Sequence, residues 1–552
     1  MKRFFLAAAC ALWTIPSASA EVFRVVPNAN GDAFPAIAQA IADAQQSEDL
    51  YNIIEFEAGD YYISKSVRLR HWTADADVPQ SERYGLLGDG KRIEFRGAGM
   101  DLTRISVPVD NHAANPMFVF DGVDRCGLAD LTLDGQVRSF DGNDWRGRHS
   151  QCGVFVFGAQ RCRMERVRFQ NLGRSDTSTT TDPIPGGANV LVACVEHDEA
   201  DGDYLPDQVV NRGVLRDSTG AIVSPGIGRS CYATKILDCD FVDDPTPGRP
   251  IPCSNFAIRM ITNWKSTKYH APHRHQHTAL SARVSESTIQ GCKFRGGFYW
   301  NAVELGGHGT VFNDILECDF TDCIQTPADV DKAASFNLLQ DNNIENTYSR
   351  SLETRAARVE PGDSLGTWTF AMRMQGYPGL EEGRTGREAI GNSFIRNKIK
   401  GVFGNTRATG AILISRTVDA LIQDNEILSL PRWVAEEDQN YRAPEDAAAG
   451  IKLGEWVRNV QLNNNLFPRS KVPSGSRKSS FVAIMELPDD SPAVVQLSDL
   501  PTLGNALTGD QRHIDLNIVE YEEGEAGGNS MFTWTISPPA TSTNTSTSMN
   551  NQ

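Results

Sequence analysis

The sequence predicts an all-β protein built as a single-stranded parallel β-helix, in which short strands wind in stacked coils along one axis. Three observations lead to this prediction: a six-residue template recurs along the chain, its closest copies lie 24 and 26 residues apart, and no helical periodicity separates them. Short strands at such a period are typical of stacked β-coils, because each coil buries its apolar face only against its neighbours.

The template consists of an apolar residue, two variable residues, Cys or Asn, one more variable residue and a second apolar residue. Its fourth position falls at Cys239, Cys292, Cys318, Asn342, Asn397, Asn425 and Asn465. An Asn at a coil corner can bond the equivalent Asn one rung away, about 4.8 Å off, and satisfy buried turn carbonyls. The cysteines at the same position are predicted to be small buried thiols. Intervals longer than the bare repeat are predicted to be single coils that carry inserted loops.

The two ends of the chain differ from the repeats. Residues 1–20, MKRFFLAAACALWTIPSASA, have the pattern of a secretory signal peptide cut before Glu21, so we expect a secreted or periplasmic bacterial protein. No later segment approaches the ~18 unbroken apolar residues of a membrane span. Residues 21–470 are expected to form the β-helix, and short strands in 471–538 to cap its last coil. Residues 539–552 are low in complexity and expected to be disordered.

The charge of the chain limits the classes of partner that it can bind. The formal net charge is −17 and the isoelectric point is about 5.1, which argues against nucleic acid, because a polyanion needs a basic face. An acidic polysaccharide held in a locally basic groove stays compatible with these values. We expect a monomer.

Three segments resemble the pectate-lyase-like superfamily of right-handed β-helices. FPAIAQAIADAQ from Phe34 and IIEFEAGDYYI from Ile53 resemble its N-terminal capping helix and first strand, and IEFRGAGMDLTRI from Ile93 resembles its next coil. The run of asparagines resembles its internal ladder. The resemblance spans Val22 to Phe467 and implies a right-handed parallel β-helix with an N-terminal capping helix and a C-terminal β cap. It implies no single activity, because that superfamily contains lyases, hydrolases, epimerases and tailspikes.

A second strand precedes each template, and its alternate residues are apolar and predicted to point inward. The residues between them are therefore predicted to face outward, one rung apart. Along successive coils this row is Phe155, Leu191, Arg259, Glu304, Gln325, Arg373, Leu413 and Lys452. Small residues stand two positions earlier and are interpreted as the floor of a trough for a chain-like ligand. The alternative is a solvated charged ladder with Arg and Glu paired across strands.

The insertion after Arg259 is rich in cationic and aromatic side chains. Its candidate site residues are Trp264, Lys265, Lys268, His270, His273 and Arg274. Insertions flank the same strand on both sides in several coils, so this loop is expected either to overhang the charged row or to be a solvated loop. Metal binding by its histidines is not favoured, because a Pro-containing loop lacks the fixed geometry of chelation.

A uronate-containing polysaccharide is the substrate class that suits this row. β-Elimination needs a cation on the sugar carboxylate, a base for the neighbouring C–H and an acid for the leaving oxygen. Arg259 and Arg373 suit the carboxylate because a guanidinium is planar and stays charged. The candidates for base or acid are Lys265, His270 and His308. Substrate contacts are expected from Gln325, Lys452, Trp264, Lys268, His273 and Arg274. Glu304 is expected to orient an arginine or to bind Ca²⁺ with Gln325 or Asp329.

Two other classes of function stay open. A glycoside hydrolase needs two carboxylates, which Glu304 and one of Asp329, Asp331 or Asp314 would supply. Gly307-His308-Gly309 resembles the Gly-His-Gly of polygalacturonase-type hydrolases, but their other acidic motifs have no match here. The third class is a carbohydrate-binding or surface β-helix without catalysis.

Overall fold

The computed structural model describes part of the chain, and all structural statements concern that part. The described residues are 20–27, 31–71, 85–88, 90–107, 114, 116–136, 152–172, 188–194, 215–216, 222–224, 230–243, 254, 256–262, 283–296, 298, 301–307, 309–348, 369–376, 388–404, 409–428, 432–433, 449–453, 460–463, 465, 480–484 and 495–496.

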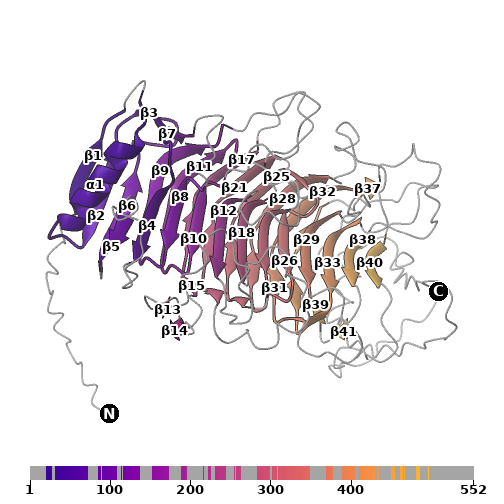
Figure 1. Cartoon of the computed structure of the whole chain (residues 1–552). Helices are drawn as coiled ribbons and strands as arrows, with labels where there is room; N and C mark the ends of the chain where they lie inside the picture. The colour runs from indigo at the N-terminus through magenta and orange to yellow at the C-terminus, as the bar shows by residue number, and fades with distance from the viewer. Residues whose placement is uncertain are drawn as a thin grey trace, which may run out of the picture.

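The one helix of the described residues, α1 (Phe34–Gln46), follows the first strand and lies across the first coil (Figure 1). Pro35 suits its first turn, where no intrahelical partner for the backbone N–H is needed. Ile37, Ile41 and Ala44 recur at helical spacing and are buried. They pack in the same core cluster as the first strands, so α1 covers the end of the core, as the resemblance implied.

Within the described residues, two long parallel sheets form the walls of the β-helix. The 12-stranded sheet contains β4 (Val67–His71), β5 (Leu86–Leu87), β8 (Phe118–Asp121), β10 (Val154–Phe157), β12 (Ala188–Cys194), β18 (Phe256–Thr262), β22 (Asn301–Gly306), β26 (Ala328–Asp331), β29 (Thr369–Gln375), β33 (Thr409–Ser415), β38 (Ala449–Leu453) and β40 (Ser480–Ile484).

The 22-stranded sheet supplies one to three strands to each coil. It contains β1 (Glu21–Val25), β2 (Tyr51–Phe56), β3 (Gly59–Tyr62), β6 (Arg92–Arg96), β7 (Thr103–Ser106), β9 (Gly127–Asp134), β11 (Arg163–Gln170), β16 (Lys235–Leu237), β17 (Asp240–Asp243), β20 (Thr288–Gln290), β21 (Lys293–Gly296), β24 (Asp314–Leu316), β25 (Asp319–Ile324), β27 (Leu338–Gln340), β28 (Asn343–Tyr348), β31 (Ser393–Ile395), β32 (Lys398–Gly404), β35 (Leu421–Gln423), β36 (Glu426–Ile427), β37 (Arg432–Trp433), β39 (Val460–Asn463) and β41 (Val495–Gln496).

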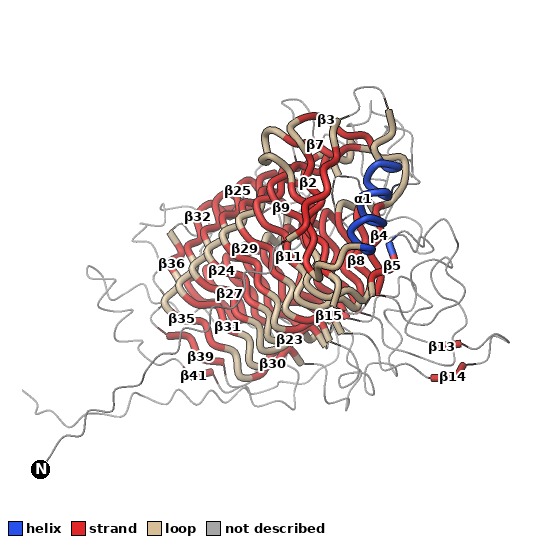
Figure 2. Tube along the Cα trace, turned by 90° about the vertical axis from the view of Figure 1, so that its left-hand side faces the viewer, coloured by secondary structure: helices blue, strands red, loops and turns tan. Residues whose placement is uncertain are grey.

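Short strands form three smaller sheets. They are β13 (Leu215–Arg216) with β14 (Ile222–Ser224), then β15 (Cys231–Tyr232) with β19 (Val284–Ser285) and β23 (Thr310–Val311), and β30 (Ala389–Ile390) with β34 (Thr417–Val418). Only β13 and β14 pair antiparallel among the described strands. One full coil runs through β26, β27 and β28, after which β29 returns beside β26. Figure 2 shows these coils stacked along one axis. The prediction of a right-handed parallel β-helix is confirmed.

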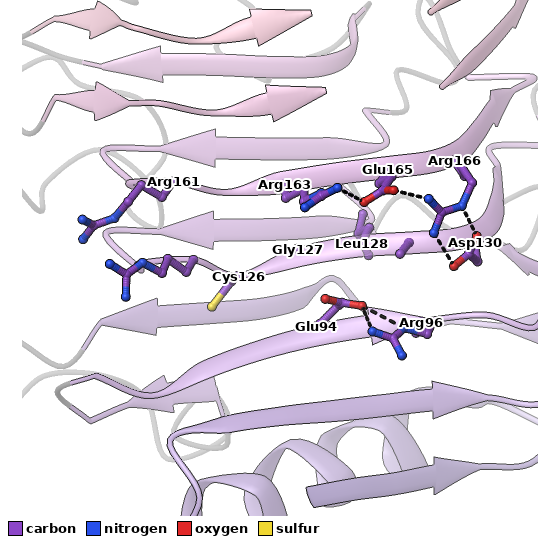
Figure 3. Close-up of a pocket in the computed structure, with 12 residues that line it drawn as sticks. Glu94, Arg96, Cys126, Gly127, Leu128, Asp130, Arg161, Arg163, Glu165 and Arg166 are labelled. Atoms are coloured by element: carbon purple, nitrogen blue, oxygen red, sulfur yellow. Dashed lines mark hydrogen bonds and ion pairs between the residues drawn. The ribbon is translucent and has the colours of Figure 1, made fainter. Parts of the chain in front are cut away.

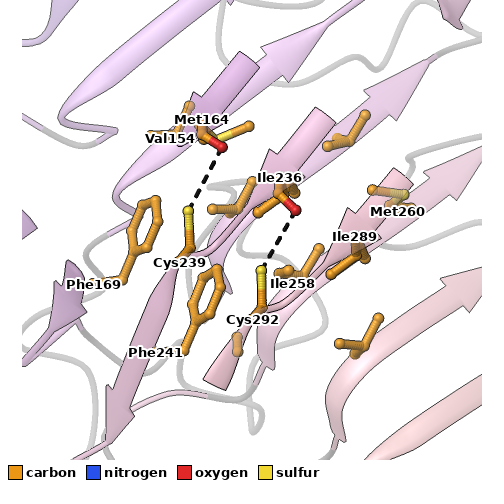
Figure 4. Close-up of a cluster of buried hydrophobic side chains, with 14 of the residues drawn as sticks. Val154, Met164, Phe169, Ile236, Cys239, Phe241, Ile258, Met260, Ile289 and Cys292 are labelled. Carbon is orange, nitrogen blue, oxygen red and sulfur yellow. Dashed lines mark hydrogen bonds between the residues drawn. The ribbon is translucent and has the colours of Figure 1, made fainter. Parts of the chain in front are cut away.

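The interior is a continuous stack of equivalent side chains from successive coils. Phe169, Phe241, Phe294 and Phe320 are fully buried, and their rings stack with centroids 4.7, 4.9 and 4.6 Å apart. This spacing is the rung separation of parallel strands, so each coil repeats the packing of the one before it. Figure 4 shows two of these rings between the aliphatic residues of both sheets.

The predicted asparagine ladder is present and continues into the cysteines. Asn397 donates one amide hydrogen bond to the carbonyl of Leu339 and one to Oδ1 of Asn425, both at 2.9 Å. Cys239 and Cys292 each place Sγ 3.6 and 3.4 Å from the carbonyls of Met164 and Ile236 one coil earlier (Figure 4). A thiol and an amide therefore bond the equivalent carbonyl at the same coil corner. Burial raises the pKa of both thiols well above the usual range.

The ends of the chain are described only in part. β40 and β41 lie within the predicted C-terminal cap and extend the two long sheets by pairing with β38 and β39. The predicted signal peptide and the predicted disordered tail lie outside the described residues, apart from Ala20. In the described part of the chain, no helix is long and apolar enough to cross a bilayer.

Candidate functional site

Four charged side chains form a vertical row on the outer side of the 12-stranded sheet. Arg259 of β18 pairs in register with Glu304 of β22, Glu304 with Asp329 of β26, and Asp329 with Arg373 of β29. Register partners on parallel strands lie about 4.8 Å apart. The sequence placed Arg259, Glu304 and Arg373 in this row, and the structure brings them together.

Gln325 does not belong to the row, and this part of the prediction is wrong. Asp329 occupies the rung between Glu304 and Arg373, while Gln325 follows β25 in a turn with φ of 62°. Gln325 is 5% exposed, and its carbonyl accepts a hydrogen bond from the backbone N–H of Phe370 at 3.1 Å. β25 of the 22-stranded sheet ends at Ile324, and the chain turns at Gln325 before β26 begins at Ala328.

The neighbouring rungs of the row are also in register, but they are not open to a ligand. Phe155 and Leu191 lie above Arg259 and pack in a second apolar cluster on the outer side of the sheet. Leu413 and Lys452 follow Arg373, and both side chains are 4% exposed. The expected substrate contact of Lys452 therefore lacks an exposed side chain.

The predicted trough of small residues is wrong as well. Ala257, Ala302, Ala371 and Ala411 have no exposed surface and pack in the main core cluster with the residues that follow them. Two consecutive residues thus contribute to the interior at the start of these strands. The simple alternation of inward and outward side chains does not hold at this position, so the alanines cannot floor an external groove.

Glu304 is the centre of one half of the charged cluster. Its Oε2 lies 3.1 Å from Nε of Arg259, and its Oε1 accepts a hydrogen bond from Nζ of Lys332 at 2.7 Å. The guanidinium of Arg259 also lies over the ring of Phe256, 4.5 Å from its centroid. Burial raises the pKa of Glu304, but the charges of Arg259 and Lys332 outweigh it and lower that pKa to about 2. Glu304 is therefore ionised at neutral pH.

Asp329 is the centre of the other half. Arg373 donates from Nε to Oδ1 at 2.7 Å and from Nη2 to Oδ2 at 2.5 Å, and the Asn301 amide donates to Oδ2 at 2.9 Å. Complete burial raises the pKa of Asp329, and although Arg373 lowers it, the nearby carboxylates of Asp331 and Glu304 raise it further, to about 6. Burial lowers the pKa of Arg373, but Asp329 and Asp331 outweigh this and raise it.

Lys332 and Asp331 join the two halves. Asp331 was among the possible hydrolytic partners of Glu304, whereas Lys332 was missed from the sequence. Lys332 follows β26 with φ of 56°, and this left-handed turn directs the lysine side chain back to Glu304. Asp331 lies 3.6 Å from Nζ of Lys332 and 3.4 Å from Nη2 of Arg373. The alternation of Asp329 and Asp331 along one strand was the available signal, because residues two apart share a face.

The cluster exposes its cations more than its central carboxylates. The side chains of Arg259, Lys332 and Arg373 are 17%, 20% and 12% exposed, whereas those of Glu304 and Asp329 are 2% and 0% exposed. Only Asp331 is a carboxylate with comparable access, at 12%. The two buried acids thus hold three cationic groups near one point of the surface. Such an arrangement can bind an anion and stabilise negative charge that develops on it.

The remaining predicted site residues lie outside the described residues. They are Trp264, Lys265, Lys268, His270, His273, Arg274 and His308. The residues beside His308 are described: Gly309 donates a backbone hydrogen bond to Oγ1 of Thr262, the last residue of β18, at 3.1 Å. Asp314, one of the proposed hydrolytic partners of Glu304, belongs to β24 in the other long sheet and does not join this cluster.

Metal coordination gains no support from the described side chains. Glu304, the proposed calcium ligand, has both oxygens in ion pairs with cations. Among the described residues, no group of three or more His, Cys, Asp or Glu side chains is arranged to hold a metal ion.

The fold and the ion-paired face define a right-handed parallel β-helix with a charged outer surface. No family model matches the sequence, and no curated protein matches it either. Solved structures do match. PfbA, a surface adhesin of Streptococcus pneumoniae, is 12% identical with a TM-score of 0.51, over 86% of this chain and 88% of that chain.

Two further solved structures match with lower TM-scores. The Dettilon tailspike protein is 10% identical with a TM-score of 0.48, over 87% of this chain and 66% of its own. The A-module of the Azotobacter vinelandii mannuronan C-5 epimerase AlgE4 is 14% identical with a TM-score of 0.40, over 85% of this chain and 94% of its own. At such identities the likeness to PfbA shows the fold alone, and these two lower scores add no argument about function.

Proposed function

We propose that this protein binds an acidic polysaccharide on the outer side of the 12-stranded sheet and cleaves it by β-elimination beside a uronate residue. The observation that carries the proposal is the convergence of Arg259, Lys332 and Arg373 over two buried carboxylates. The N-terminal pattern of a secretory signal supports action outside the cytoplasm, where such polymers occur.

The roles follow from charge and position. Arg259 and Arg373 bind the uronate carboxylate and neutralise it, which acidifies the hydrogen on the neighbouring carbon. Glu304 and Asp329 hold the two guanidiniums in place and are positioning residues. A base takes the C–H proton, the electron pair forms a carbon–carbon double bond, and the bond to the glycosidic oxygen breaks. That oxygen leaves with its electron pair and takes a proton from an acid.

The acid belongs beside the cations. Among the described residues Lys332 is the best candidate, because its ammonium lies at the cluster and is 20% exposed. Its hydrogen bond to Glu304 and its ion pair with Asp331 favour the protonated form, which can give a proton to the leaving oxygen. Lys265, His270 and His308 remain the candidates for the base, from the loops that flank the row.

The test is degradation of a panel of uronate-containing polysaccharides by the mature chain. Ultraviolet absorbance reports unsaturated ends, and a reducing-sugar assay reports all cleavage. We expect both signals, and we expect Arg259→Ala and Lys332→Ala to lose them while staying folded at the assay temperature, with a lower melting temperature because the buried Glu304 loses one partner. Arg396→Ala is the control for loss of an ion-paired arginine away from the row, because Arg396 bonds Asp341 at an exposed turn beside the other long sheet. Equal activity in all three variants would remove the proposal.

Hydrolysis is the second candidate, and the pKa values of two neighbouring carboxyls favour it. Glu304 and Asp329 are register partners whose pKa values are about 2 and about 6, a division that suits a base and an acid. Against it, both groups are almost fully buried in ion pairs. Reducing ends without ultraviolet absorbance would establish hydrolysis, and binding without either product would establish a carbohydrate-binding protein. Loss of activity on chelation, restored by Ca²⁺, would reveal a metal requirement.

A further inference from the structure

An arginine-lined cavity lies on the 22-stranded sheet near the N-terminal end of the β-helix, on strands that contribute nothing to the charged row. It has a volume of about 440 Å³ and is lined by residues of β6, β9, β11 and the turns that precede β9 and β11. Its charged lining residues are Glu94, Arg96, Arg125, Asp130, Arg161, Arg163, Glu165 and Arg166 (Figure 3).

The hollow exists because the middle strand carries short side chains. β9 contributes Gly127 and Ala129 to the lining, whereas β6 and β11 on either side contribute Glu94, Arg96 and Glu165. The long side chains of β6 and β11 therefore form the walls of the cavity, and the short side chains of β9 form its floor. From Cys126 to Asp130 the floor spans about 13 Å at the strand rise of ~3.3 Å per residue. Its volume falls within the ~300–1,000 Å³ of ligand pockets. An oligosaccharide suits this length better than a single ring.

Most of the charged lining residues neutralise one another. Arg96 donates from Nε to Oε1 of Glu94 at 2.8 Å, and Arg166 donates to Asp130 at 2.6 and 3.0 Å. Arg163 forms an ion pair with Glu165. Figure 3 shows these pairs along the strands, with Arg161 at the opposite end of the cavity. The excess positive charge of the lining therefore resides at the Arg125 and Arg161 end.

At that end two guanidiniums share one carboxylate. Arg125 and Arg161 occupy equivalent left-handed turns of adjacent coils, with φ of 54° and 51°, and the residues before them form a bridge. Arg161 bonds Asp124 at 2.6 and 2.8 Å, whereas Arg125 approaches the same carboxylate only at 3.8 Å. Both side chains are about two-fifths exposed, at 40% and 42%. Two like charges one rung apart repel, and a second anion between them relieves that repulsion.

We propose that this cavity is a second binding site for an anionic glycan. An oxyanion, either carboxylate or sulfate, lies between Arg125 and Arg161, and the sugar chain extends over Gly127 and Ala129 toward Asp130. The guanidinium fork suits both oxyanions, because each offers two oxygens that can accept its parallel N–H bonds. Such a site would hold an acidic polymer at a distance from the charged row, and it does not depend on whether that row is catalytic.

The experiment is a calorimetric titration of the mature chain at low ionic strength with two probes of equal length, a uronate oligosaccharide and a sulfated neutral oligosaccharide. To keep the charged row out of the measurement, both titrations use the Arg259→Ala background. We expect binding of at least one probe, and the tighter one identifies the oxyanion. Binding should weaken as salt is added. The double variant Arg125→Ala/Arg161→Ala should weaken it by at least tenfold, since two charge-assisted contacts are lost.

The matched control is Arg396→Ala/Lys398→Ala, which removes two exposed charges from the same sheet several coils away. Arg396 has φ of 52° and bonds Asp341 at 2.8 and 2.7 Å, which reproduces the geometry of Arg161 and Asp124. The control should change the affinity by less than about twofold. Absence of binding of both probes, or an equal loss in the control, would overturn the proposal. Because the readout is binding, it is independent of whether the charged row cleaves any polymer.

Discussion

Arg373 donates two hydrogen bonds to the carboxylate of Asp329 from the adjacent rung, and neither group could remain buried without the other. Asp329 has no exposed surface. A buried carboxylate without a partner carries the full cost of desolvation, whereas a fork of two charge-assisted bonds offsets it. The same logic applies one rung away, where Glu304 lies under Arg259 and Lys332. The side chains of the row are thus held in place by their ion pairs as well as by the pairing of the strands that carry them.

Breaking this pair on one side should be costly. Asp329→Ala removes the bidentate partner of the Arg373 guanidinium and leaves the longer ion pair with Asp331, so we expect the free energy of unfolding to fall by about 3–5 kcal/mol. The double variant Asp329→Leu/Arg373→Met removes both charges and should regain most of that loss. Thermal unfolding of the three variants and the wild type measures the difference. A double variant as unstable as the single one would show that packing at this rung, and not charge pairing, dominates.

A change of pH should alter the stability contributed by Glu304 and by Asp329 in opposite directions. Glu304 has its pKa lowered to about 2, so the stability it contributes is complete above its unfolded pKa near 4.5 and is lost as pH falls toward 2. Asp329 has its pKa raised from 3.8 to about 6, so the folded state binds the extra proton between these values. The stability from that proton is complete below 3.8 and is lost as pH rises through 6.

Melting temperatures across this pH range test both signs. Asp329→Asn should remove the loss of stability between pH 3.8 and 6, and Glu304→Gln should remove the loss on acidification below 4.5. A wild-type profile that rises steadily from pH 4 to 6, and stays unchanged in Asp329→Asn, would contradict the raised pKa.

The fold could be predicted because its signals repeat. Each coil must place an amide or thiol donor at the same corner and a large apolar side chain at the same interior position, so Asn397 and Phe294 each reinforce the same pattern. A single coil would not reveal it. The helix α1 was expected for a different reason, the resemblance of FPAIAQAIADAQ to a capping helix, and the burial of Ile37 and Ile41 at helical spacing agrees with that expectation.

The residues of the charged row could be predicted only in those coils where the strand before the template is a strand of the 12-stranded sheet. Between Cys323 and Asp331 the chain offers two segments that alternate, and only the three-dimensional turn at Gln325 shows that the second belongs to the 12-stranded sheet. Lys332 reaches the cluster by a left-handed turn, which no periodicity encodes. The alanine positions failed because two successive residues point inward there, so counting by twos gave the wrong face.

The asparagine ladder should be sensitive to a single truncation. Asn397→Ala removes the donors to Leu339 and Asn425, and it also removes the acceptor of the Asn342 amide at 2.9 Å. Each unsatisfied buried group costs about 1–3 kcal/mol, so we expect a clear fall in the melting temperature. Asn343→Ala is the control, because that exposed side chain makes only a long contact of 3.4 Å with Asp319. Similar melting temperatures for the two variants would show that the ladder does not carry stability.

One glycine makes room for the central carboxylate of the charged row. Gly306 ends β22, and a Cβ at this position would lie 2.8 Å from Oε1 of Glu304, the oxygen that accepts the hydrogen bond from Lys332. Gly306→Ala should therefore displace the carboxylate from Lys332 without introducing or removing any charge. The nearest clash is with the end of a side chain, so we expect only a small loss of stability. We expect a larger loss of turnover, because the cations would lose their alignment.

Gly88→Ala is the matched control, since a Cβ there would meet nothing within 4 Å. Both variants should unfold near the wild-type temperature, and only Gly306→Ala should lose cleavage of the acidic polymer. The change should appear mainly in kcat if Glu304 positions the groups that act in the transition state, and mainly in KM if it only supports binding of the uronate. Full activity of Gly306→Ala would mean that the alignment of Glu304 with Lys332 is not needed for the reaction, and the acid would then have to come from the loops beside the row.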